Sequence, residues 1–368
     1  MSLQAGARPG SPEEVLPMSM VPGQLEFVIG VDTHKSRHAV AVVDHLGGLI
    51  ASTSVAATAA AFSWLMEWLE DRAHGVRVWS VEGSSGYGAG LTGYVQERGE
   101  MVYEADRPKR PPRQRGAKSD EIDAIRAARE LLSRQHLGEP RMRGRREAVR
   151  LLLVSRKLAV DAATKHLILI KALLITLPLE LREQLEGLSD GRLVSRCREL
   201  RTSKGSTPEM QFSVRTLRTI AGRISGLKQD AAADERELAK LIGELAPQLL
   251  RQPGISTVLA AEIYNAWSHP GRIRSEAAFA SLAGVAPIPA SSGQVVRHRL
   301  NRSGDRRLNR ALHIVVLSRL RHHPQTREYV ERRAAEGKTK AEVRRCLKRY
   351  VARQVFRLLE TEGRLDMT

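Results

Sequence analysis

The sequence predicts a mixed α/β domain at the N-terminus, a long helical middle region and a mainly α-helical C-terminal domain. Three observations lead to this fold class. Short apolar runs separated by turn residues fill residues 27–105, apolar residues recur three and four apart over 145–177 and 214–249, and basic helical segments follow from about residue 249. The length of 368 residues suits such an arrangement of separate cores.

The expected domain boundaries follow these changes of pattern. Residues 1–26 are rich in Gly, Pro and Ser and are expected to be a disordered extension, and residues 27–135 form the α/β domain. Residues 136–248 form a helical coiled-coil region that assembles the protein, and residues 249–368 form the C-terminal domain.

The α/β domain is predicted to begin with an antiparallel meander. Its elements are, in order, strands over 27–31, about 39–43 and 49–55, a helix over 57–73, a strand over 76–82, a helix to about 98 and a strand over 101–105. Three antiparallel strands followed by alternating helices and strands is the order of the RNase H-like fold, whose sheet places acids from its first and fourth strands side by side. Trp64 and Trp68 stand at helical spacing and are expected in the core.

Four carboxylates are placed as a metal-ion site for phosphodiester chemistry would require. Asp32 ends the first apolar run and Glu82 closes another. Asp120 and Asp123 lie three residues apart on one face of the helix predicted from AKSDEIDAIRAARELL. Mg²⁺ prefers oxygen ligands, and bound metal ions can stabilise both the attacking and the leaving oxygen of a phosphate. The sequence therefore predicts a Mg²⁺ site that acts on a nucleic-acid backbone.

The charge of the chain indicates the same partner. It has 59 Lys and Arg against 41 Asp and Glu, a formal net charge of +18 and a pI near 10.5, which is typical of proteins that neutralise phosphates. A ribosomal or membrane-surface protein would share this composition. Two basic runs are the candidate nucleic-acid contacts. They comprise Arg107, Lys109, Arg110, Arg113, Arg115 and Lys118 in the first run and Arg297, Arg299, Arg302, Arg306, Arg307 and Arg310 in the second.

Cysteine usage and hydropathy exclude several other classes of protein. Cys197 and Cys346 are far apart, so neither a disulfide framework nor a zinc site is predicted. The most apolar stretch is interrupted by Lys171 and Pro178 and falls short of the roughly 20 residues that a spanning helix needs. We therefore expect a protein of the reducing cytoplasm without membrane contact.

Apolar residues of the middle region form a coiled-coil-like seam. Over 214–249 they alternate three and four apart, with one break at Asp234, and a similar helix is predicted over 145–177. The two helices form either a hairpin within one chain or an arm that dimerises, and both alternatives fit the pattern. Residues 178–210 are polar and are expected to form an irregular loop at the tip.

The C-terminal domain contains two features that suit phosphate chemistry. LLRQPGISTVLAAEI has the pattern of a helix-hairpin-helix, in which backbone amides around Pro253-Gly254-Ile255 can meet a phosphate, although a plain helix start would look similar. Ser291 and Ser292 stand in a loop before the second basic run. A phosphate-attacking hydroxyl needs such cationic neighbours, whereas a structural turn on a basic surface is the alternative.

Taken together, these stretches resemble the DEDD-type transposases of bacterial insertion sequences, the group called IS one-ten with its IS eleven-eleven relatives. The matching segments are VIGVDTHKSRHAVAVVD, VEGSSGYGAGL, RGAKSDEIDAIRAARELL and SEAAFASLAGVAPIPASSGQVVRHRLNRSGDRRLNRALH, in this order. The resemblance implies a RuvC-like N-terminal domain whose four acids bind Mg²⁺, a coiled coil for assembly, and a C-terminal transposase domain with a serine nucleophile. Ser292 is preferred over Ser291 because its Ser-Gly pair matches the family motif best.

The resemblance also implies partners. Such transposases use a structured bridge RNA whose two loops pair with donor and target DNA, while the protein grips backbone and shape. The RuvC-like site of one subunit and the serine of another would form a composite site in a tetramer, a dimer of dimers, in the bacterial cytoplasm. This serine recombinase would work through a phosphoserine intermediate. A structure-selective RuvC-like endonuclease without a covalent intermediate would explain the acids but not the serine, and a nucleic-acid-packaging protein would explain only the charge.

Overall fold

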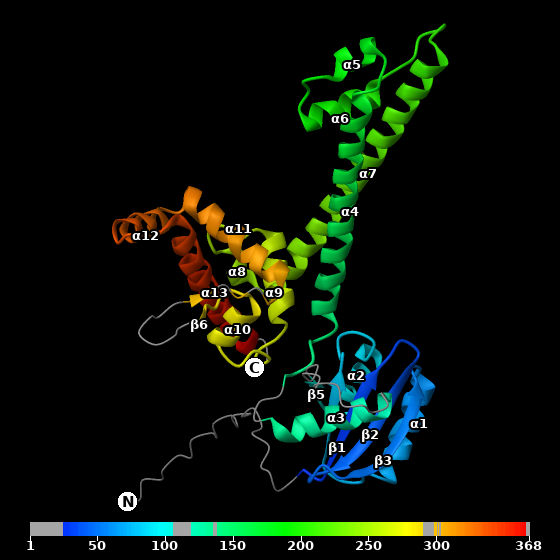
Figure 1. The fold of residues 1–368 in the computed structure, drawn as a ribbon, viewed down its shortest axis with the longest axis vertical. Coiled ribbons are helices and arrows are strands. Elements are labelled where there is room, and N and C mark those ends of the chain that lie inside the picture. The colour runs from blue at the N-terminus through cyan, green and yellow to red at the C-terminus, as the bar shows by residue number, and fades with distance from the viewer. Residues whose placement is uncertain are drawn as a thin grey trace, which may run out of the picture. The chain divides into compact units, whose positions relative to one another are not determined.

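The computed structural model describes residues 25–105, 119–134, 138–289, 298–299, 301 and 303–365. The chain divides into two compact units, unit 1 (Met1–Arg141) and unit 2 (Met142–Thr368) (Figure 1). In the described part of the chain, unit 1 contains a five-stranded sheet, whereas unit 2 is almost wholly helical.

Unit 1 is built on a sheet with the strand order β3-β2-β1-β4-β5. Its strands are β1 (Phe27–Thr33), β2 (Arg37–Asp44), β3 (Leu49–Ala56), β4 (Arg77–Glu82) and β5 (Met101–Ala105). The first three strands pair antiparallel, whereas β4 runs parallel to β1 and β5 runs parallel to β4. This mixed order is that of an RNase H-like domain, as the strand pattern predicts.

Alternation of side chains along the strands gives the sheet two apolar faces, and helices cover both. The covering helices are α1 (Ala59–Glu70), α2 (Ala89–Gln96) and α3 (Asp120–Ser133). Ile29, Val31 and Trp79 belong to the cluster under α1 and α2, whereas Val28 and Val78 belong to the cluster under α3. Residues two apart share a face, so the side of α3 is also the side of residues 30 and 32 of β1.

Gly30 lets α3 pack directly on the centre of the sheet. A Cβ atom at Gly30 would stand 2.0 Å from the carbonyl oxygen of Ala124 and 2.8 Å from the Cβ of Ala128, which is closer than real atoms approach. The Ser80 hydroxyl on β4 donates a buried hydrogen bond of 2.7 Å to the Ala127 carbonyl of the same helix. This close approach determines where the first turn of α3 lies relative to β1 and β4.

The expectation that both tryptophans of α1 lie in the core is wrong for Trp64. The buried stripe of α1 consists of Phe62, Leu65 and Leu69. The side chain of Trp64 is 47% exposed, and its ring stacks on that of Trp68 with the centroids 6.3 Å apart. The leucines fit the pleated sheet and set the rotation of the helix, so the larger rings are left at its margin.

Unit 2 begins with a helical arm made by α4 (Arg145–Leu174) and α7 (Pro208–Leu245), which pack along each other as a hairpin within one chain (Figure 1). At its tip lie α5 (Leu179–Leu185) and α6 (Asp190–Glu199). The expectation of an irregular loop over 178–210 is wrong for these two helices. Leu193 and Cys197 recur at helical spacing and are buried in a core that Leu217 of α7 completes.

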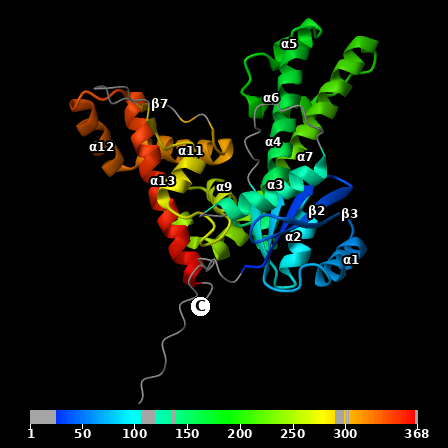
Figure 2. The same cartoon turned by 60° about the horizontal axis from the view of Figure 1, so that its bottom comes forward.

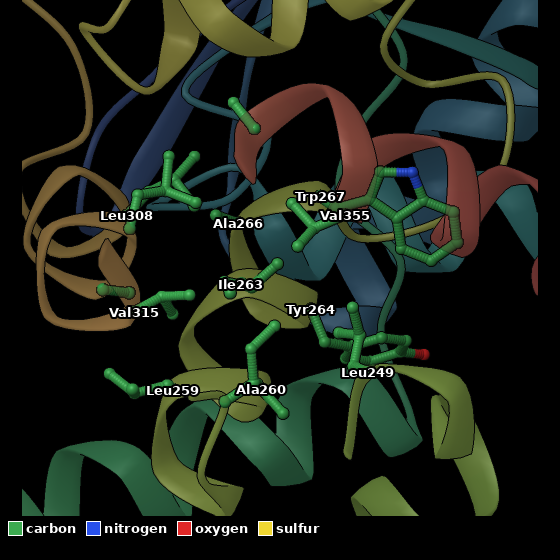
Figure 3. Close-up of a cluster of buried hydrophobic side chains, with 14 of the residues drawn as sticks. Leu249, Leu259, Ala260, Ile263, Tyr264, Ala266, Trp267, Leu308, Val315 and Val355 are labelled. Carbon is green, nitrogen blue, oxygen red and sulfur yellow. The ribbon is translucent and has the colours of Figure 1, made fainter. Parts of the chain in front are cut away.

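The rest of unit 2 is a compact group of helices around α9. Its elements are α8 (Pro247–Leu250), α9 (Thr257–Trp267), α10 (Glu276–Leu282), β6 (Ile288–Pro289), β7 (His298–Arg299), α11 (Arg306–His322), α12 (Pro324–Ala335) and α13 (Lys340–Leu365). Leu259 and Ile263 of α9 share one buried cluster with Val315 of α11 and Val355 of α13 (Figure 3). No helix in the described part of the chain is long and apolar enough to cross a membrane.

The turn between α8 and α9 packs against α11. Gly254 has a φ of +76°, and a Cβ there would stand 3.1 Å from the side chain of Ser318. The Ile255 amide donates a hydrogen bond of 3.2 Å to the Gln252 carbonyl, so this amide is already engaged. A phosphate site of the helix-hairpin-helix type at this turn stays a prediction.

Candidate functional site

Asp32 and Glu82 lie at neighbouring strand ends in unit 1. β1 and β4 run parallel, and their last registered pair is Val31 with Val81, so the next residues, Asp32 and Glu82, come side by side. Partners in a parallel pair point to the same face of the sheet, which here is the face under α3. Asp32 is 8% exposed. The register thus puts a buried acid and a second acid at one edge of the sheet.

The first turn of α3 and a histidine complete a close group around Asp32. His34 Nε2 lies 3.2 Å from Asp32 Oδ2 and 3.4 Å from Asp120 Oδ1. Ligand atoms of these three side chains lie within 4.8 Å of one another, and no other set of this kind occurs among the described residues. Ser119 caps α3 by accepting a hydrogen bond of 3.2 Å from the Ile122 amide, which holds Asp120 in the first turn. His34 was not predicted as a site residue, although its place two residues after Asp32 in the sequence is a usable signal.

The electrostatics of this group favour a bound cation. Burial raises the pKa of Asp32, the adjacent His34 lowers it, and the charges of Asp120 and Asp123 raise it. Acids that lie beside a buried acid oppose its ionisation, so a cation that neutralises the group is bound favourably. Carboxylate oxygens suit Mg²⁺, and an imidazole nitrogen beside them suits transition metals. The donor set therefore fits a divalent cation.

Glu82 and Asp123 lie outside this close group. Asp123 Oδ1 accepts a hydrogen bond of 2.8 Å from Arg126 within α3. The Glu82 carbonyl accepts a hydrogen bond of 2.7 Å from the Thr33 hydroxyl, and Glu82 lines an open cavity of about 650 Å³. The structure therefore brings Asp32 and Asp120 together through His34, while the participation of Glu82 and Asp123 stays a prediction.

Two protein-family models match the chain. Residues 29–177 match the DEDD model of the IS110 type, described as "Transposase", and residues 246–331 match the model described as "Transposase IS116/IS110/IS902 family". Both matched regions are therefore similar to transposases of the IS110 kind. The first match contains the acids of the sheet edge, and the second contains the serine loop with the second basic run.

Two curated proteins are similar to part of this chain. The insertion element IS900 uncharacterized 42 kDa protein of Mycobacterium paratuberculosis is 30% identical over 138 residues, which are 36% of this chain and 34% of that protein. The insertion element IS110 uncharacterized 43.6 kDa protein of Streptomyces coelicolor is 27% identical over 144 residues, which are 38% of this chain and 36% of that protein. The chain thus spans about a third of the length of the curated relatives it matches.

The structure describes the serine loop only at its flanks. Ser291, Ser292, Arg297 and Arg302 lie outside the described residues, as does every residue of the first basic run. The roles predicted for these residues therefore stay predictions.

The described flanks of the serine loop are anchored between α10 and α11. β6 and β7 pair antiparallel, with Pro289 opposite His298. The Asp305 amide donates a hydrogen bond of 2.7 Å to the Leu282 carbonyl, and Asn309 Nδ2 donates one of 2.6 Å to the Ala283 carbonyl. Both ends of the loop are therefore tied to the helical core of unit 2.

The described arginines of the second basic run have different environments. Arg299, Arg306 and Arg307 are exposed. Arg310 instead donates to the carboxylate of Glu262, which is 8% exposed on α9. Burial raises the pKa of Glu262, and Arg310 opposes that effect. Arg310 thus already has an anionic partner within the chain, and the phosphate contacts expected of the other three arginines stay a prediction.

Proposed function

We propose that this protein is a transposase that cuts and rejoins donor and target DNA during the movement of an insertion sequence. The observation that supports this most strongly is the meeting of Asp32, His34 and Asp120 at the edge of an RNase H-like sheet, inside a region that matches a DEDD transposase model. The second family match, over residues 246–331, supports a further transposase domain on the same chain.

Mg²⁺ would be held by Asp32, Glu82, Asp120 and Asp123. The fit rests on the buried carboxyl of Asp32, on the exposed carboxyl of Asp120 whose charge raises the pKa of Asp32, and on the register that brings Glu82 to the same edge. Bound Mg²⁺ supplies stabilisation for charge on the attacking and leaving oxygens of a phosphodiester. His34, within hydrogen-bond reach of Asp32, would hold that carboxylate in its orientation.

Ser292 would be the nucleophile, and its phosphoserine ester would conserve the free energy of the broken phosphodiester bond for rejoining. Its hydroxyl loses a proton as Oγ bonds to the scissile phosphorus, and the bond from phosphorus to the 3′ oxygen breaks, so that this oxygen takes up a proton as a free 3′ hydroxyl. The 3′ hydroxyl of another strand can then attack the phosphoserine, which rejoins DNA and releases Ser292. The exposed arginines that follow the loop would neutralise the phosphates around it.

A structured bridge RNA and a dimer of dimers complete the proposal. The RNA is proposed from the family resemblance, since base pairing can read sequence while the protein holds the backbone. Assembly is supported by apolar residues of α4 that are open to solvent, since Leu151, Leu158 and Ile168 are each more than half exposed. Apolar side chains at such spacing on an arm suit a partner helix, so the arm can form a hairpin in one chain and still assemble with a second.

A covalent protein–DNA adduct separates this function from the alternative, a structure-selective RuvC-like endonuclease. Protein, RNA and end-labelled DNA are incubated with Mg²⁺, and the mixture is run on a denaturing gel. The wild type should give an adduct and Ser292→Ala should give none, with DNA binding retained. Ser291→Ala is the matched control and should keep the adduct. Metal-dependent cleavage by Ser292→Ala, with no adduct from the wild type, would instead favour the endonuclease.

A further inference from the structure

A second cavity lies within unit 2, between α11, α12 and α13, which pack together in both views (Figure 1; Figure 2). It encloses about 200 Å³, and its wall includes Arg319, His323, Thr326, Tyr329 and Tyr350. Small-molecule sites usually occupy roughly 300 to 1,000 Å³, so this cavity suits a single ring system or a small anion. The second family match ends at residue 331, so α13 closes the cavity from outside the matched region.

Arg319 is the cationic part of the wall. Its Nε donates to the Pro253 carbonyl and its Nη1 donates to Gln354 Oε1, each at 2.8 Å. Its Nη2 is buried and has no hydrogen-bond partner among the described residues, which also provide no carboxylate to pair with it. Burial lowers the pKa of this guanidinium. A buried donor without an acceptor costs free energy, and a ligand whose acceptor meets the guanidinium after a turn of the Arg319 side chain would recover it.

Tyr350 adds aromatic surface that is open to solvent. The residue is 53% exposed, and its ring meets that of Tyr329 edge to face, with the centroids 5.6 Å apart. The guanidinium carbons of Arg332 and Arg333 lie 5.5 and 6.0 Å from the centre of the Tyr329 ring. Exposed rings among arginines are the means by which many proteins hold unpaired bases, because every base has a face that can stack.

The guanidinium of Arg319 and the exposed ring of Tyr350 together indicate which kind of ligand the cavity binds. Inorganic phosphate would use Arg319 but leave the ring of Tyr350 without a role, and an apolar ligand would leave the guanidinium unsatisfied. A nucleobase has both a face that stacks on a ring and carbonyl or ring-nitrogen acceptors that a guanidinium can meet. The net charge of +18 favours a nucleic acid as its source.

We propose that this cavity receives one unpaired base of the bound nucleic acid, with the base stacked on Tyr350 and an acceptor edge toward Arg319. The proposal rests on the proposed function only in that the partner is a nucleic acid. It assigns to unit 2 a contact that distinguishes unpaired from paired nucleotides. DNA and RNA share this chemistry, and a fully paired duplex offers no free base to the cavity.

The test is a binding titration of the full chain without divalent metal, so that no strand is cut. The probes are a single-stranded DNA with a 2-aminopurine at one position, an RNA of the same sequence and the fully paired DNA duplex. Tyr350→Ala should weaken single-strand binding by about 5- to 150-fold, which corresponds to the roughly 1–3 kcal/mol of one stacked base. It should also remove the quenching of 2-aminopurine on binding. Tyr350→Phe keeps the ring and should bind like the wild type, and duplex binding should not change.

Phe212→Ala is the matched control, because it removes a ring that is 60% exposed on α7, away from the cavity wall, and should change none of these affinities. A loss with DNA alone or with RNA alone supports the proposal and identifies the source of the base. Unchanged single-strand binding by Tyr350→Ala overturns it, and so does an equal loss for single strand and duplex. Cleavage and recombination are not measured, so a failure of the acid site or of Ser292 would leave this result unaffected.

Discussion

Two buried carboxyl groups, one in each unit, have the same burial and opposite surroundings. Asp32 in unit 1 and Glu262 in unit 2 are each 8% exposed, and burial raises the pKa of both. Asp120 and Asp123 raise the pKa of Asp32 further, although the adjacent histidine lowers it. Arg310, with other arginines near it, lowers that of Glu262.

The difference teaches that a buried acid does not by itself indicate a metal site. Glu262 has its cation within the chain, because Arg310 donates to it directly. Among the described residues, the charges that act on Asp32 besides His34 are those of the acids Asp120 and Asp123, so we propose that a cation from outside the chain completes the group. The sign of the neighbouring charges therefore separates a structural ion pair from a candidate active site.

The largest effect is expected on strand cleavage, when the carboxylate of Asp32 is removed. Asp32→Ala should lower Mg²⁺-dependent strand cleavage by about 1,000-fold, since metal-ion stabilisation supplies several kcal/mol of the barrier reduction. Folding and metal-free nucleic-acid binding should be retained, because the change also removes buried repulsion. Cleavage of labelled DNA measures the first effect and a filter-binding titration the second. Asp71→Ala, at a highly exposed acid in unit 1, is the control and should cleave normally.

Close packing of α3 on the sheet can be broken without touching any acid. Gly30→Ala places a Cβ against the Ala124 carbonyl, so α3 must move, and unit 1 should lose about 3 kcal/mol of stability. Cleavage should fall as well, because Asp120 moves with the helix. Gly90→Ala on α2 is the matched control, since a Cβ there would stand 3.7 Å from Phe62, an ordinary contact. Denaturant unfolding compares them, and equal stability of the two variants would contradict the role given to Gly30.

Metal binding should stabilise the protein through Asp32 and not through Glu262. At a Mg²⁺ concentration ten times its dissociation constant, the expected gain is about 1.4 kcal/mol, because the ion binds the folded chain. Asp32→Asn should abolish the rise in melting temperature, whereas Glu262→Gln should keep it. A rise that survives Asp32→Asn would place the cation elsewhere.

The smallest effect is a pH dependence that belongs to Glu262. Its raised pKa means that the native state holds the proton more tightly than the unfolded chain does, for which the ordinary value is 4.5. Its contribution to stability is therefore fully present below that value and is lost as the pH rises through the native pKa. The melting temperature of the wild type minus that of Glu262→Gln should therefore increase as the pH falls toward 4.5. A change in the opposite direction would show that the ion pair with Arg310 outweighs burial.

Much of unit 1 was predictable because strands and helices leave periods of two and about 3.6 in the sequence. The strand over 101–105 was predicted at its observed bounds, and the helix with Asp120 and Asp123 was placed by its pattern. Prediction failed where helices were short and amphipathic, as in α5 and α6, whose exposed polar residues resembled a loop. It also failed for Trp64, since spacing indicates a helix but not which of several apolar residues faces the sheet.

By itself, the sequence determined the order of strands and helices, the excess of positive charge and the placement of Asp32 and Glu82 at the ends of apolar runs. These properties depend on residues close together in the chain. Only the tertiary structure decided that His34 joins Asp32 and Asp120, that Arg310 pairs with Glu262, and that Arg319 and Tyr350 line one cavity. Each of these arrangements joins separate elements, and close packing, such as that of α3 on Gly30, sets the distance between such elements. The spacing of residues along the sequence does not indicate that distance.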